Sequence, residues 1–504
     1  MSKFLDILVI FVLSVLAYSV LPFFAVFMGI SLVWRKCVNI SVQVMIARGE
    51  TWTMLPASGT ITTSPYGPHS WSLFVTMQVN QKTVREDFNH NVVQKLERNS
   101  ASRRLYPELK SCLTERFGYY FWKQCPTFNI EDHINYLDCP EIQKFDDAPD
   151  LNKLTNYLLR GRRWTEGKPL WEVLLLQDKD GKSLIIFRMH HVIGDGWSVL
   201  KIWEKVFTTR DVRPGLQGAP VQTLREEGNL SKQMFSGIKT PHQLVKLFRS
   251  LSKNRGKIPK TAQIAPSAEG ICAASREGLP MIEMKAIRAK FGVHFFPVLL
   301  AGLAGAVRQN FVAHKVNIPE SIPVLSVIPR PCHPEKSRNH GTVCIILLPT
   351  GDPVQRLMMI SESVKTYTKS SLPDFLYWIG MFAGCLPLPL VRVMNKKPTN
   401  VIPLVLTNVV GPPNRCWVAG SEIERIQMGQ NILFESSSGF SFGVAFLSYE
   451  SETTLGTIGL DVNFPSLTIP HAILDHCTAE WKGLLDTTFA ITKNDDVTSQ
   501  SITV

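Results

Sequence analysis

RMHHVIGDGW, residues 188–197, is the stretch of the sequence that decides how the fold is interpreted. The apolar run LIIF at 184–187 comes immediately before it and is typical of a short buried strand. Gly194 and Gly196 flank an aspartate and end that strand before a helical pattern begins at Trp197. The sequence therefore predicts two adjacent histidines at the end of a strand, followed by a turn and a helix.

His190 and His191 cannot both do the same work, because successive side chains on a strand point to opposite faces. A neutral imidazole has a pKa of about 6.5 and can accept a proton from a hydroxyl at neutral pH. Asp195 follows closely enough to brace the turn, either by accepting backbone N–H groups or by pairing with a distant arginine. One histidine is therefore a candidate general base, and a purely structural pair is the common alternative.

Strand and helix patterns follow one another along the chain, which predicts an α/β fold. Residues 71–79 alternate as a strand does, and an Asp-Gly turn at 180–181 joins two apolar runs into a hairpin that ends at the histidines. A basic amphipathic helix is predicted from Thr240, and an apolar helix over 282–311. The apolar segment 372–394 is predicted to be a helix near the cleft or at a membrane interface.

The composition is that of a folded protein with a basic bias. Of 504 residues, 45% are hydrophobic and 19% charged, and the net charge is +12, which favours anionic partners such as acidic lipids or the phosphates of a ligand. No nucleic-acid-binding motif accompanies the charge, so nucleic acid is not expected as a partner. The ten cysteines include no Cys-x-x-Cys, which argues against a zinc site and against a disulfide framework, and favours a reducing compartment.

The N-terminal region holds 27 residues without a charge, from Ile7 to Val33. This run is long enough to cross a bilayer and longer than the apolar core of a cleaved signal peptide, although Pro22 could kink it or turn it into a re-entrant hairpin. Basic residues are more numerous after the run than before it, which predicts a body on the cytosolic face of a membrane. An uncleaved anchor with the body facing a lumen is the alternative.

Five blocks occur in an order that resembles the wax ester synthase/diacylglycerol acyltransferase family, within the larger group whose fold is similar to chloramphenicol acetyltransferase. The blocks are Phe128-x-x-x-x-His133, Pro169-Leu-Trp171-Glu172, His190-His191-x-x-x-Asp195-Gly196, Leu348-Pro349 and Asn408-Val-x-Gly411-Pro412.

This resemblance implies two chloramphenicol acetyltransferase-like α/β subdomains with an active-site tunnel between them, and the apolar run at Ile7 to Val33 adds an N-terminal membrane helix. The implied organisation is a membrane anchor at 1–36, a connector at 37–70, an N-terminal subdomain with the His-His-x-x-x-Asp-Gly motif at 71–208, a basic linker at 209–280, a C-terminal subdomain at 281–492 and a disordered tail at 493–504.

The resemblance also implies an activity. The enzyme would transfer a long-chain acyl group from acyl-CoA, used as a substrate, to a fatty alcohol or diacylglycerol, with no metal and no resident cofactor. His191 would be the general base, Asp195 would fix the loop, and Gly196 would leave room for substrate. The location implied is a membrane, namely the endoplasmic reticulum with the body facing the cytosol.

Further residues receive supporting roles in this interpretation. His190 would be structural, Arg330 would pair with Asp195, and Asn408 would bond a ligand or the opposing loop. The residues expected to contact substrate are Pro169, Trp171, Gly411 and Pro412.

One departure from the family pattern keeps a second class of function open. Phe296 and Pro297 stand where family members commonly carry an Asn-Asp pair. A catalytically weak, membrane-associated protein that binds lipid or acyl-CoA and retains the fold is therefore the alternative. Acylation of a small polar alcohol or amine is disfavoured by the N-terminal anchor and by the absence of an Asp-Phe-Gly-Trp-Gly block.

Overall fold

The molecule is represented by a computed structural model. It describes residues 2–46, 49–63, 72–83, 85–90, 92, 106–138, 154, 157–158, 162, 164–207, 239–254, 271–313, 315, 317–330, 333–334, 336–395, 404–430, 442–460 and 470–487. The linker expected at 209–280 and the tail expected at 493–504 lie largely or wholly outside these residues.

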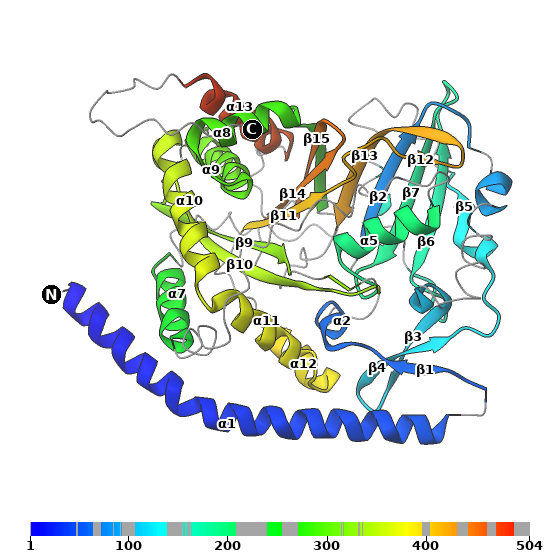
Figure 1. Ribbon diagram of the computed structural model, residues 1–504, viewed down its shortest axis with the longest axis horizontal. Coiled ribbons are helices and arrows are strands. Elements are labelled where there is room, and N and C mark those ends of the chain that lie inside the picture. The colour runs from blue at the N-terminus through cyan, green and yellow to red at the C-terminus, as the bar shows by residue number, and fades with distance from the viewer. Residues whose placement is uncertain are drawn as a thin grey trace, which may run out of the picture.

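Two separate six-stranded sheets form the body, and each has its own apolar core (Figure 1). The N-terminal sheet has the strand order β12-β13-β2-β7-β6-β5. Its strands are β2 Ser72–Val79, β5 Ile134–Tyr136, β6 Trp171–Gln177, β7 Ser183–His190, β12 Trp417–Val418 and β13 Ser421–Gln430.

The central strands of this sheet are apolar and buried on both faces, as the run before the histidines predicted. β6 and β7 form the predicted antiparallel hairpin, with Val173 opposite Phe187. The turn between them is closed by Asp178, whose Oδ1 accepts the N–H groups of Asp180 and Lys182. The hairpin thus delivers the histidines to one end of the sheet.

The C-terminal half of the chain completes the N-terminal sheet. β13 runs antiparallel to β2, with Gln427 opposite Thr76, although its residues were expected to belong to the C-terminal subdomain. Ile426 and Val418 lie in the core of the N-terminal sheet. Sequence order therefore does not divide the two subdomains cleanly.

The second sheet has the order β10-β9-β11-β14-β15-β8 and carries helices α8, α9, α10 and α13. Its strands are β8 Ile271–Glu277, β9 Ser321–Pro329, β10 Gly341–Pro349, β11 Leu404–Val410, β14 Phe442–Tyr449 and β15 Glu452–Leu460. The helices are α8 Met281–Phe291, α9 Phe295–Ala313, α10 Pro353–Lys369 and α13 Pro470–Asp486.

The single helix expected over 282–311 is two helices. Gly292 has a φ of 61°, a left-handed conformation that ends α8, and α9 begins three residues later. Phe296 and Pro297 therefore occupy the first turn of α9, where a proline removes no helical hydrogen bond. β8, moreover, begins inside the expected linker.

The stretch expected as a connector, 37–70, is largely structured where it is described. α1, Ser2–Met45, continues into it, and β1 Trp52–Met54 and α2 Ala57–Ile61 follow. β1 joins β3 Ser111–Arg116 and β4 Tyr119–Gln124 in a small antiparallel sheet. A disulfide joins Cys112 to Cys125 across this sheet, a pairing that the cysteine spacing did not reveal.

α1 lies along one side of the body rather than projecting from it (Figure 1). It is one continuous helix with Pro22 inside it, so the re-entrant hairpin is not formed. α7 Thr240–Asn254 confirms the predicted basic helix, and the segment 372–394 forms α11 Leu372–Ala383 and α12 Leu388–Asn395. Short helices complete the fold: α5 Gly196–Ile202, the π-helix Trp203–Phe207, and the 3-10 helices Pro107–Lys110 and Ile130–His133.

Candidate active site

His190 ends β7 and is fully buried, with 0% of its surface exposed. The Val192 N–H donates to its Nδ1 at 3.0 Å, so the ring proton of the neutral imidazole is on Nε2. Its carbonyl accepts the Ile193 N–H at 3.0 Å. These bonds shape the turn after the strand and are what a structural role for His190 requires.

His191 is the first residue after β7 and is partly exposed. Its carbonyl accepts the Asn339 side-chain N–H at 3.0 Å, which fixes the backbone from the opposite subdomain. Burial lowers the pKa of the His191 imidazole, and this effect exceeds the opposing ones of its own carbonyl, Asp195 and Asn339. The imidazole is therefore neutral at pH 7 and able to accept a proton.

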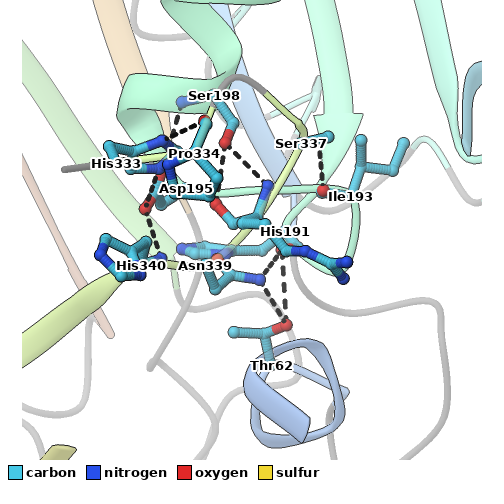
Figure 2. A network of polar contacts seen from close by, with 11 residues as sticks. Thr62, His191, Ile193, Asp195, Ser198, His333, Pro334, Ser337, Asn339 and His340 are labelled. Atoms are coloured by element: carbon cyan, nitrogen blue, oxygen red, sulfur yellow. Dashed lines mark hydrogen bonds and ion pairs between the residues drawn. The ribbon is translucent and has the colours of Figure 1, made fainter. Parts of the chain in front are cut away.

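Asp195 connects the motif to the C-terminal subdomain (Figure 2). Its side chain caps α5 by accepting the Ser198 N–H at 2.9 Å, and it also accepts the His340 N–H at 2.9 Å. Nε2 of His333 lies 3.2 Å from both carboxylate oxygens. Burial by itself raises the pKa of the Asp195 carboxyl, but His333 and the two backbone N–H groups together hold it below its usual value.

His333 carries a positive charge in this arrangement. Its Nδ1 faces the Pro334 carbonyl at 2.9 Å and its Nε2 faces the Asp195 carboxylate, so both nitrogens must donate. Burial lowers the pKa of His333, but its bonds to Asp195 outweigh that effect and raise the pKa above its ordinary value. The result is a largely buried ion pair between the two subdomains.

Arg330 is not the partner that the structure gives to Asp195, contrary to our expectation. Its guanidinium lies 3.7 Å from Asp374 and stacks 3.8 Å above the ring of Tyr377, both on α11. Arg330 directly follows β9, and His333, three residues later in the sequence, pairs with the carboxylate. The arginine therefore joins β9 to α11, and the histidine takes its expected role.

Both glycines of the motif lie in close contacts. A Cβ at Gly194 would come within 2.4 Å of Cβ of Ser198 and 2.9 Å of Oγ of Ser337, so no larger residue fits without movement. A Cβ at Gly196 would lie 3.2 Å from the Val409 side chain, which brings the end of β11 against the motif. The two subdomains thus meet at residues 194–196.

The block at 408–412 lies at this junction, with individual residues in different environments. Successive side chains of β11 point to opposite faces of the sheet. Val409 contacts Gly196, so Asn408 lies on the other face, together with Leu406. Gly411 approaches the Ser448 carbonyl, where a Cβ would come within 2.1 Å. The Pro412 carbonyl accepts the Glu450 N–H at 2.9 Å.

The Pro169-Leu-Trp-Glu block supports the N-terminal core. Pro169 is buried at its start, and Trp171, 1% exposed, donates its indole N–H to the Leu109 carbonyl at 2.8 Å. His133 stacks on Trp171 with ring centroids 4.7 Å apart and donates from Nδ1 to the Trp171 carbonyl. These contacts give Trp171 and His133 structural roles, away from Asp195.

Several site residues were missed in the sequence or left without a role. The Thr62 hydroxyl, in the expected connector, donates to the Gly59 carbonyl and accepts from Asn339 at 3.3 Å. Ser337 donates to the Ile193 carbonyl, and Ser198 donates to the Arg338 carbonyl. In the sequence, Asn339-His340-Gly341 loosely resembles a Gly-Asn element of the family, and this was the only signal for the loop.

A small cavity adjoins this network at the subdomain junction. It is lined by residues of α2, the 3-10 helix at 107–110, β4, the motif and the loop: Pro56, Ser58, Gly59, Glu108, Trp122, Val192, Ile193, Ser337, Arg338 and Asn339. Burial raises the pKa of the Glu108 carboxyl, against the smaller effects of Arg338 and Lys336. Within the described ranges, no group of three or more His, Cys, Asp or Glu could hold a metal ion.

The fold and the site define a class of protein. The chain has the two-subdomain α/β fold of chloramphenicol acetyltransferase-like and condensation-like proteins, with the His-His-x-x-x-Asp-Gly motif between its halves. Residues 68–293 match the wax ester synthase/diacylglycerol acyltransferase catalytic domain, and residues 339–484 match the C-terminal domain of the same family. The chain belongs to this family of acyltransferases.

Individual relatives are distant. A Mycobacterium tuberculosis protein named as a putative diacylglycerol O-acyltransferase is 24% identical to this chain over 372 residues. The match covers 65% of this chain and 71% of that protein. A second protein from that organism, named as the probable diacylglycerol O-acyltransferase tgs2, is 22% identical to this chain. The match covers 72% of this chain and 83% of that protein. Both proteins are bacterial, so they give no support to the expected endoplasmic reticulum location.

Solved structures show the same fold at low identity. The wax ester synthase/diacylglycerol acyltransferase from Marinobacter aquaeolei VT8 is similar with a TM-score of 0.53 and 15% identity, covering 86% of this chain and 100% of that one. Trichothecene 15-O-acetyltransferase from Fusarium sporotrichioides is similar with a TM-score of 0.58 and 11% identity, over 86% of this chain and 95% of that one.

Proposed function

We propose that this acyltransferase moves a long-chain acyl group from acyl-CoA to the hydroxyl of a fatty alcohol or diacylglycerol, at a membrane, with His191 as the general base. The observation that carries the proposal is the state of His191. Its imidazole is neutral, and the residue lies partly exposed where both subdomains meet, on a backbone held from the opposite subdomain.

The reaction follows from a base beside a hydroxyl. His191 takes the proton from the acceptor hydroxyl while that oxygen attacks the thioester carbonyl carbon. The tetrahedral intermediate then collapses, the carbon–sulfur bond breaks, and the imidazolium returns its proton to the CoA thiolate. No acyl-enzyme is needed, because both substrates are held next to the same base.

The residues around His191 act as positioning residues in this proposal. Asp195 holds the turn through α5 and the 333–340 loop, and His190 shapes the backbone that leads to His191. Gly196 allows the Val409 side chain to lie close against the motif. Roles for Asn408, Gly411 and Pro412 in binding substrate remain predictions of the family resemblance, as does the tunnel.

The test is an acyl-transfer assay on membranes that carry the native chain or His191→Ala, with labelled long-chain acyl-CoA. Fatty alcohol and diacylglycerol are offered separately, so the product identifies the acceptor. Loss of the base is expected to lower the rate by about 10²- to 10⁴-fold. His294→Gln is the matched control, because His294 is exposed on the loop between α8 and α9.

Two outcomes contradict the proposal. Equal ester formation by the native chain and His191→Ala would exclude His191 as the base. No ester from either chain, with acyl-CoA still bound in a filter assay, would instead support the alternative of a lipid- or acyl-CoA-binding protein.

A further inference from the structure

The outer surface of α1 is apolar in a way that helices facing water are not. No charged residue occurs between Ile7 and Trp34. Large side chains on it stand free of the body: Phe11 is 63% exposed and Phe23 is 77% exposed. Only 6% of its most apolar 18-residue stretch is buried within the protein. An apolar surface of this extent requires an apolar environment.

The inner surface of α1 mixes polar and apolar contacts with the body. Ser14 and Ser31 are 6% and 7% exposed, and the Ser14 hydroxyl lies 3.1 Å from Nδ1 of His242 on α7. Val38 and Val42 are also buried against the body. α1 therefore carries apolar side chains on the outer side as well as on the inner one, which indicates that its outer side faces lipid rather than water.

Contacts with one protein body hold α1 along nearly its whole length. Asp6 pairs with Arg249 at 3.0 Å near one end, and the Gln43 side chain donates to the Trp52 carbonyl at 2.9 Å near the other. In the middle, the ring of Phe24 lies 4.9 Å from that of Phe382 on α11.

The length between these contacts decides the orientation of α1. From Asp6 to Gln43 the helix rises about 55 Å, at about 1.5 Å per residue, whereas the apolar core of a bilayer is about 30 Å thick. If α1 crossed a bilayer with these contacts intact, the folded body would have to enter the bilayer too.

α11 and α12 lie beside α1 (Figure 1), and they also carry exposed apolar side chains. Trp378 on α11 is exposed, as are Val393 and Met394 on α12. Exposed cations lie on the same helices, Lys36 after the charge-free part of α1 and Lys246 in α7. Such an arrangement fits the acyl region of a membrane with anionic head groups at the rim.

We propose that α1, α11 and α12 insert together into one leaflet of an anionic membrane, with α1 lying in the membrane plane and both of its ends on the side of the body. This differs from the anchor expected from the sequence, which crosses the bilayer. A second copy of the chain could also cover an apolar face, and the second experiment below separates that case.

The first experiment maps the two ends of the full chain in sealed membranes. Epitope tags are placed before Ser2 and after Val504, and an impermeant protease is added before and after detergent. Both tags are expected to be cleaved or protected together. Protection of one tag alone would show that α1 crosses, and would overturn the proposal.

The second experiment measures binding of the purified full chain to vesicles with and without phosphatidylserine. The double variant Phe11→Asp/Phe23→Asp is expected to reduce the bound fraction at least tenfold. Ile282→Asp, on exposed Ile282 of α8, is the matched control and is expected to bind as the native chain does. Unchanged binding by the double variant, or a stable dimer that binds no vesicle, would overturn the proposal. Both readouts are independent of acyl transfer.

Discussion

His333 is the residue whose role was least accessible to sequence analysis. His333 forms an ion pair with Asp195, which lies 138 positions away in the sequence. The imidazolium of His333 thus takes the place expected for the guanidinium of Arg330. Unlike an arginine, it can lose its charge within a few pH units of neutrality. The site should therefore respond to pH through a positioning residue as well as through the base.

Acyl-transfer activity should fall on both the acid and the alkaline side of its optimum. The His191 pKa is lowered, so activity is expected to rise with pH through a midpoint below the ordinary histidine pKa of about 6.5. The His333 pKa is raised, so the stability from its pairing is fully present below about 6.5 and is lost as pH rises through the raised value. The Asp195 pKa is lowered, so its contribution is lost only as pH falls below its usual range.

His333→Arg separates these effects. A permanent charge should remove the alkaline loss in both thermal unfolding and kcat while leaving the acid limb in place. His333→Gln, which cannot pair ionically, should lower kcat at the pH values where the native His333 is charged and should remove most of the alkaline limb. If the native chain and His333→Arg share one alkaline limb, His333 is not its cause.

Gly194→Ala tests how tightly the turn is packed. The added Cβ would overlap the Cβ of Ser198, which is part of α5 and cannot rotate away. We expect a loss of about 1–3 kcal/mol in the free energy of unfolding, together with a fall in activity. The measurement is denaturant unfolding alongside the acyl-transfer assay.

Gly483→Ala is the control for that variant. Gly483 lies in α13, and a Cβ added there would meet no atom within 4 Å. Alanine at this position should therefore be neutral or stabilise the chain by up to about 1 kcal/mol. Equal free energies of unfolding for the two variants would contradict the close packing that we infer at Gly194.

At the scale of elements, the β3–β4 hairpin carries a disulfide that the cysteine spacing had argued against. Ten cysteines without a recognisable spacing favoured a reducing compartment, but β3 and β4 bring Cys112 and Cys125 together. The pairing depends on strand register, which spacing alone does not give.

Cys112→Ser tests the hairpin. The two cysteines are 13 positions apart, and closing a loop of this size should stabilise the chain by up to about 3 kcal/mol. The variant should therefore unfold at lower denaturant, as the native chain should after reduction. Cys37→Ser, at an exposed free cysteine, is the control. Alkylation of both thiols without a reductant, followed by mass spectrometry, would show that no disulfide forms.

At the scale of the whole molecule, the two subdomains depend on each other. β13 of the C-terminal half pairs with β2, and the 333–340 loop closes the motif of the N-terminal half. An N-terminal half alone would expose the edge of β2 and lose core residues such as Ile426.

Dividing the chain between Asn254 and Ile271 should therefore give two pieces that copurify when expressed together and aggregate when expressed alone. Ile426→Asp in the C-terminal piece should abolish copurification, since Ile426 is buried in the N-terminal core. Size-exclusion chromatography of each piece provides the measurement. A soluble, monomeric N-terminal piece would contradict this dependence.

The sequence by itself determined the features that are local. Apolar runs, an Asp-Gly turn and helix-start signals predicted the β6–β7 hairpin, α7 and the position of the two histidines, because such patterns reflect burial and turn geometry within a few residues. The motif blocks, taken in order, led to the family.

Only the tertiary structure decided which distant residues meet. It placed His333 rather than Arg330 on Asp195, brought Thr62 and Asn339 to the His191 backbone, and moved β13 into the first sheet. It also laid α1 along the body. These contacts join residues more than a hundred positions apart, and they depend on how sheets and helices pack, which no local pattern of residues specifies.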